Sequence, residues 1–106
     1  MSKLVLVFVN GADDEFKKDL SRQAQEKFAT DLAMMMDGLK PLSDSKPMSG
    51  LGKGVLELKK NGRPAYRCVY VIRNGTIYVL HAFSKTSNGT SKANETTIKS
   101  RYKSIP

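Results

Sequence analysis

Two Asn-Gly pairs, at residues 61–62 and 74–75, lie in the middle of this chain and constrain its fold more than any other feature. They separate three runs rich in β-branched and aromatic residues, at 55–60, 65–73 and 76–84. Asn-Gly readily adopts the two successive positive φ angles that a tight antiparallel turn requires. The pattern therefore predicts an antiparallel meander of these three runs.

The residues before the meander predict a strand followed by helix. Residues 3–9 (KLVLVFV) form a short apolar run that ends at an Asn-Gly turn, and we expect a first strand that is mostly buried. Apolar residues then recur at helical spacing over residues 12–39, as one long helix or two in series. Ser21 is suited to cap a second helix, and Gly38 is suited to end it.

The remaining segments complete an α+β order. Residues 40–54 are rich in Pro, Gly and Ser and predict a loop, and residues of about 93–102 predict a short C-terminal helix. We expect a RelE-like arrangement, with the N-terminal strand and helix or helical hairpin packed on an antiparallel sheet. At 106 residues, positions 1–106 suit a single domain.

Cysteine and histidine usage argues against a disulfide or a metal. The chain has one cysteine, Cys68, and one histidine, His81, so it lacks the clusters that zinc sites use. Cys68 lies in an apolar run and is expected to be a buried small hydrophobe. No apolar window approaches a membrane span, and the N-terminus lacks a secretory signal pattern. We expect a cytoplasmic protein with no cofactor and no membrane partner.

Charge is distributed unevenly along the chain. Residues 1–44 hold six Lys or Arg against eight Asp or Glu, whereas residues 45–106 hold twelve against two. A basic segment of this size is typical of nucleic-acid binding, because each neutralised phosphate releases counterions. The alternative is a basic surface that serves only solubility.

Arg67 is the first candidate site residue, because it lies inside a largely apolar strand. A guanidinium in such a strand needs an anion, and its planar donor pattern suits a phosphate. The alternative is a salt bridge to Glu57 on the neighbouring strand.

The turn at 61–62 decides which basic residues accompany Arg67. A strict two-residue turn would pair residue 60 with residue 63 and bring Lys60 and Arg63 to the face of the sheet that carries Arg67. One additional bulge residue would instead bring Glu57 and Lys59 there. The sequence does not choose between the two registers.

His81 is the second candidate. Alternation along the strand predicts that it shares a face with Ile77, Val79 and Phe83, and Lys85 follows just beyond. Imidazole exchanges a proton near neutral pH, which suits catalysis. The alternative is that this lone histidine serves packing or substrate contact.

A basic site without metal suits RNA cleavage by the 2′-hydroxyl. A base removes the hydroxyl proton, cations stabilise the charge on the five-coordinate phosphorus, and an acid protonates the departing 5′ oxygen. Lysine acts as a base when neighbouring cations favour its neutral form, so Lys59 beside Lys60 is the expected base. The alternative for both lysines is a solvated strand edge. Further RNA contacts are expected from Lys53, Lys60, Arg63, Tyr66, Arg73, Arg101 and Tyr102.

Several motifs together resemble the HigB branch of the RelE/ParE toxin superfamily, including its phage-borne relatives. They are Glu-Leu-Lys at 57–59, Tyr-Arg at 66–67, and Leu-His-Ala-Phe at 80–83 followed by Lys85. The expected helical segment precedes them and a basic C-terminal helix follows, so the resemblance covers nearly the whole chain.

The resemblance implies the toxin of a type II toxin-antitoxin system, a ribosome-dependent endoribonuclease that cuts mRNA without a metal. Its partners would be the ribosome, mRNA and a cognate antitoxin, often a helix-turn-helix protein. Lys59, Arg67 and Lys85 match the family's basic positions, with Lys85 as one of two lysines usual after His-x-Phe. The alternative is a catalytically silent protein of this fold that inhibits DNA gyrase or binds RNA.

Overall fold

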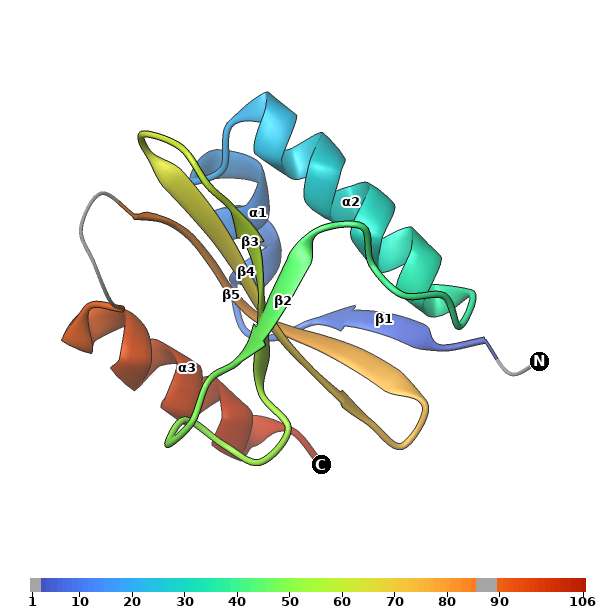
Figure 1. The fold of residues 1–106 in the computed structure, drawn as a ribbon. Coiled ribbons are helices and arrows are strands. Elements are labelled where there is room, and N and C mark those ends of the chain that lie inside the picture. Colours follow the sequence, from blue (N-terminus) through green and yellow to red (C-terminus); the bar gives the residue numbers. More distant parts are fainter. Residues whose placement is uncertain (1–2, 86–89) are drawn as a thin grey trace.

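The computed structural model describes residues 3–85 and 90–106 and has an α+β architecture (Figure 1). The elements are β1 (Val5–Phe8), α1 (Ala12–Lys18), α2 (Arg22–Met36), β2 (Asp44–Pro47), β3 (Leu56–Lys60), β4 (Ala65–Arg73), β5 (Thr76–Lys85) and α3 (Lys92–Ser104). The strands form one mixed sheet in the order β1-β5-β4-β3-β2. The predicted α+β class is confirmed, and the arrangement is compatible with a RelE-like fold.

The sheet separates two apolar cores. Phe28, Leu32 and Met35 of α2 pack with Cys68 and Ile77 on one face. On the other face, Ile98 of α3 packs with strand residues that include Val69, Val71 and Leu80. Helices α2 and α3 therefore cover opposite faces, as Figure 1 shows. None of the helices among the described residues has the length and apolar character needed to cross a membrane.

The β4–β5 hairpin forms as predicted, whereas the β3–β4 connection is longer than predicted. Asn74 and Gly75 have φ angles of 52° and 75°, and Arg73 pairs directly with Thr76. In the β3–β4 hairpin Lys60 pairs with Tyr66, so the strict two-residue turn at 61–62 is wrong. Pro64 has no amide hydrogen for the ladder, which explains why pairing resumes only beyond it.

The first strand differs from prediction in direction and burial. β1 pairs with β5 in parallel, so the sheet is mixed rather than wholly antiparallel. Val5 and Val7 are 60% and 38% exposed, which contradicts the expectation of a mostly buried strand. The strand lies at the sheet edge, where one long side has no neighbouring strand among the described residues.

An edge strand also forms where the sequence predicted only a loop. Asp44–Pro47 forms β2 and pairs with β3, although all four residues are exposed. Its composition, DSKP, gives no strand signal, so the pairing depends on the neighbouring strand.

The helical segment consists of two helices, one of the predicted alternatives. The Ser21 hydroxyl accepts a hydrogen bond from the Ala24 amide at 3.1 Å, which caps α2 as predicted. Gly38 follows the helix with a φ of 80°. Cys68 is fully buried, as expected, and burial, with a smaller contribution from the Asp31 carboxylate, raises the pKa of its thiol to about 12.

A β-bulge at Leu80 changes the face on which His81 lies. Val69 pairs with His81 and Tyr70 pairs with Val79, which leaves Leu80 without a partner in β4. The extra residue reverses the alternation, so His81 lies on the α3 face while Val79 packs toward α2. The predicted shared face of His81 with Ile77 and Val79 is therefore wrong, although Phe83 does accompany it.

Candidate functional site

A row of polar and charged residues crosses the sheet on its α3 face. Lys59 lies directly opposite Arg67 on β4, and Arg67 lies opposite Phe83 on β5. Lys85 is two residues beyond Phe83 and shares its face, since alternate residues of a strand point the same way. The structure therefore brings Lys59, Arg67 and Lys85 to one region of one face. Lys59 lies on the face that the bulge alternative predicted, but the register differs, because five residues (61–65) and not three separate the paired residues Lys60 and Tyr66.

Arg67 forms the predicted alternative contact, an ion pair with Glu57. Its Nε lies 3.8 Å from Glu57 Oε1, and the two side chains are only 7% and 9% exposed. One Nη1–H donates to the Tyr66 carbonyl oxygen at 2.9 Å. Arg67 Nε and Glu57 Oε2 are buried without a hydrogen-bond partner in the part of the chain that the structure describes. The pair is thus held by charge attraction with incomplete hydrogen bonding.

His81 is enclosed by partners from two helices. Its Nδ1 lies 2.8 Å from Glu15 Oε1 on α1, and its Nε2 lies 2.7 Å from Asn94 Oδ1 on α3. Its ring stacks on Phe83 with a centroid distance of 4.9 Å. Both ring nitrogens therefore have partners within the fold.

Arg101 completes this cluster of Glu15, His81, Asn94 and Arg101, which we call the Glu15 network. Its Nη1 and Nη2 donate to the two Glu15 oxygens at 2.7 and 3.0 Å, and Nη1 also donates to the Leu80 carbonyl oxygen at 3.0 Å. Burial alone would raise the pKa of Glu15, but the hydrogen bonds from Arg101 and His81 outweigh it and lower that pKa. Arg101 thus joins α3 to α1 and β5.

Arg73 and Tyr102 contact each other. Arg73 lies on β4, which also carries Arg67, and Tyr102 lies on α3, which also carries Arg101. Arg73 Nη2 donates to the Tyr102 hydroxyl at 2.7 Å, and its guanidinium lies 4.9 Å from the centre of the ring. Tyr102 also packs on Gly52 and accepts a hydrogen bond from the Lys53 amide at 3.1 Å. The ring of Tyr102 is therefore occupied by contacts within the fold.

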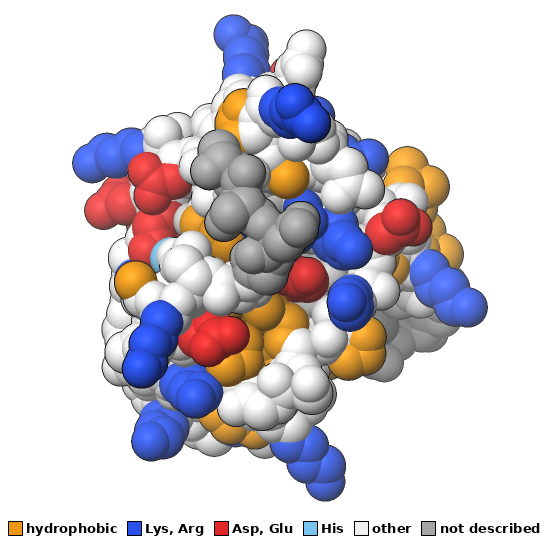
Figure 2. Space-filling model, turned by 60° about the vertical axis from the view of Figure 1, so that its left-hand side comes forward, with side chains coloured by type: hydrophobic (Ala, Val, Ile, Leu, Met, Phe, Trp, Pro, Cys, Tyr) orange, Lys and Arg blue, Asp and Glu red, His pale blue; other side chains and the backbone are white. Residues whose placement is uncertain are grey.

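The other predicted contact residues are more dispersed. Tyr66 packs against the α2 core, and Lys60, one residue before the turn and paired with Tyr66, lies on the same face. Arg63 and the Lys53 side chain are exposed in loops. Figure 2 shows Lys and Arg side chains spread over one side of the molecule with acidic side chains between them.

Sequence reasoning missed Asp31, a buried carboxylate on α2. It is 1% exposed, and its Oδ1 accepts from the Leu42 and Ser43 amides at 2.9 and 3.1 Å, while Oδ2 accepts from the Ser43 hydroxyl. A signal was present, because Asp31 interrupts the apolar stripe that includes Phe28, Leu32 and Met35. Glu15 and Asn94 gave no comparable local signal.

The fold and its basic row define a small α+β protein of RelE-like architecture. The model of the family described as phage derived protein Gp49-like (DUF891) matches residues 14–103. The chain belongs to this family of RelE/toxin-like proteins. A search of curated proteins finds no significant match.

Proposed function

We propose that this protein is the toxin of a type II toxin-antitoxin system and cleaves mRNA on the ribosome. The cross-strand pairing of Lys59 with Arg67 carries the proposal, because it brings two cationic side chains to adjacent positions on one face. Membership of a phage-derived, toxin-like family supports it. The excess of positive charge in residues 45–106 supports attraction to RNA.

In the proposed reaction, Lys59 removes the proton of the 2′-hydroxyl, whose oxygen attacks the adjacent phosphorus. Arg67 stabilises the additional negative charge, and Lys85 donates a proton to the departing 5′ oxygen. The products are a 2′,3′-cyclic phosphate and a free 5′-hydroxyl. Exposed Lys53 and Arg63 are proposed to contact neighbouring phosphates.

Two residues of this proposal have partners that constrain their roles. Arg67 must exchange part of its contact with Glu57 for the phosphate, and since its side chain is only 7% exposed it must also move toward the surface to do so. His81 is assigned a positioning role, because Glu15 and Asn94 occupy its nitrogens and it supports the strand that carries Lys85.

Mapping of mRNA 5′ ends in translating cells tests the proposal. Expression of the wild type is expected to produce cuts within codons of ribosome-bound mRNA, and Lys59→Met is expected to reduce them at least tenfold. Lys3→Met is the matched control, since Lys3 is 83% exposed and pairs with Asp37. Arg67→Gln is combined with Glu57→Gln, because the double variant removes both buried charges and separates chemistry from folding.

An experiment in which mRNA stays intact would contradict the proposed nuclease activity. If wild-type expression stops growth without cutting mRNA, the nuclease assignment fails, and gyrase-dependent DNA breaks would then favour the binding alternative. The proposed partners are tested in the same cells, since a helix-turn-helix protein encoded beside this chain is expected to restore growth when co-expressed.

A further inference from the structure

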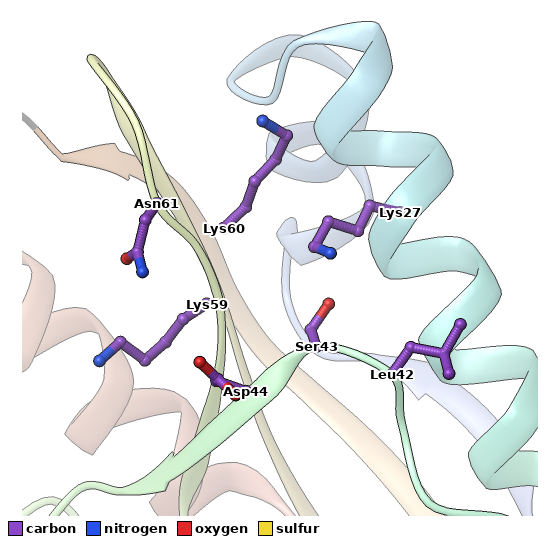
Figure 3. Close-up of a pocket in the computed structure, with 7 residues that line it drawn as sticks. All are labelled: Lys27, Leu42, Ser43, Asp44, Lys59, Lys60 and Asn61. Carbon is purple, nitrogen blue, oxygen red and sulfur yellow. The ribbon is translucent and has the colours of Figure 1, made fainter.

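A second cluster of basic residues lies on the other side of the sheet, between β3 and α2. Lys27 of α2 and Lys60 of β3 line a hollow of about 380 Å³, whose other lining residues are Leu42, Ser43, Asp44, Lys59 and Asn61. Figure 3 shows the Lys27 and Lys60 side chains directed into the gap between the helix and the strand. Lys60 is on this face because its cross-strand partner Tyr66 packs against the α2 core.

The charges in this hollow are unbalanced. Within residues 3–85 and 90–106, neither Lys27 nor Lys60 forms an ion pair with a carboxylate. Asp44 also lines the hollow, but it lies opposite Lys59 on the paired strands, and Figure 3 shows it on the Lys59 side. Because Lys59 and Asp44 lie opposite each other, their charges offset, and the charges of Lys27 and Lys60 leave the hollow positive. The two ammonium groups carry the same charge, and an anion bound between them would be attracted by both.

One wall of the hollow is held in place by a buried carboxylate. Asp31 binds the amides of Leu42 and Ser43 and the Ser43 hydroxyl, so the chain leaving α2 is fixed where it passes the two lysines. Pre-ordered walls lower the entropy cost of binding a ligand. Leu42, which is 74% exposed, adds an apolar surface at the rim.

We propose that this hollow binds a backbone phosphate of RNA, through Lys27 and Lys60, on the face of the sheet opposite Arg67. The combination of two unpaired ammonium groups with an adjoining apolar side chain favours a nucleotide over a free phosphate ion, because a nucleotide places a sugar and a base beside each phosphate. The inference rests on the proposed function for its ligand class, but it concerns binding and not cleavage. The site would help to hold the strand or the ribosome while the reaction takes place on the other face.

Fluorescence anisotropy with a 2′-O-methyl RNA oligonucleotide tests the site, because this RNA cannot be cleaved by its own 2′-hydroxyl. For single strands each phosphate contact contributes about 0.7 to the slope of log K against log salt. Loss of one or two contacts in Lys27→Gln/Lys60→Gln is expected to lower that slope by about 0.7 to 1.4, and the affinity at about 0.1 M salt roughly 5- to 25-fold. Lys27→Arg/Lys60→Arg is expected to retain binding.

The control Lys3→Gln/Lys18→Gln removes the same charge from exposed positions. If it weakens RNA binding as much as Lys27→Gln/Lys60→Gln, or if neither changes it, the inference is overturned. Equal competition by inorganic phosphate and by RNA at the same concentration would also overturn it. Cleavage is measured separately, on translated mRNA. If the wild type cleaves mRNA but Lys27→Gln/Lys60→Gln binds RNA as well as the wild type does, only this binding site is refuted. If the wild type does not cleave mRNA but the double variant loses RNA binding as expected, only the nuclease assignment is refuted.

Discussion

Replacing Arg67 with methionine is expected to destabilise the fold strongly, because it leaves the Glu57 carboxylate without its partner. The Glu57 side chain is only 9% exposed, and its nearest cationic group is Arg67 Nε at 3.8 Å. Removal of one partner of a buried ion pair costs about 3–5 kcal/mol. That loss is a large part of the total stability of a typical domain, which is about 5–15 kcal/mol.

Replacing both residues with methionine is expected to have the opposite outcome. Glu57 Oε2 and Arg67 Nε are already buried without hydrogen bonds among the described residues, and each such group costs about 1–3 kcal/mol. Glu57→Met/Arg67→Met removes both charges and fills similar space with apolar atoms. Such replacements are often neutral or stabilising by about 1–4 kcal/mol.

Urea unfolding of the wild type, the single variant and the double variant measures both effects. A change of midpoint at constant slope reports a change in the free energy of unfolding. The double variant is expected to be at least as stable as the wild type. If it is as unstable as Arg67→Met alone, the ion pair itself stabilises the fold, and the missing hydrogen bonds do not offset that contribution.

Three further predictions concern other buried groups. Folding lowers the pKa of Glu15 below its ordinary value of 4.5, so its contribution to the stability of the fold is present above pH 4.5 and is lost as pH falls through the folded pKa. Glu15→Gln is therefore expected to lower the free energy of unfolding by about 2 kcal/mol at pH 7. The difference between this variant and the wild type in thermal unfolding should shrink in acid, and a difference that stays constant would contradict the prediction. Asp31→Ala is expected to cost at least about 2 kcal/mol and to speed amide hydrogen exchange at Ser43, and unchanged exchange there would count against the proposed anchoring. The thiol of Cys68, with its pKa raised to about 12, is expected to react with thiol reagents only as fast as the protein unfolds, and rapid labelling of the native state at pH 8 would disprove its burial.

The candidate site was only partly predictable from the chain. Arg67 and Lys59 could be chosen as candidates, but two registers of the β3–β4 hairpin remained open, and the structure has neither of them. Its longer connection places Lys59 on the face of Arg67, as the bulge alternative did, but directly opposite it. The position of His81 was mispredicted because the bulge at Leu80 depends on how β5 fits both β4 and the cores. Neither the Glu15 contact nor the Asn94 contact follows from strand alternation.

The amino-acid sequence by itself determined the features that depend on neighbouring residues. The Ser21 cap, the two-residue turn at Asn74-Gly75, the extent of β4 and the basic charge of residues 45–106 all follow from local preferences or from composition. Tertiary structure alone decided the parallel pairing of β1, the existence of β2 and the Glu15 network, in which Glu15 meets His81 and Arg101 across 66 and 86 residues of chain. The physical reason is that local preferences act over a few residues, whereas these contacts form only when distant segments are packed together and exclude water.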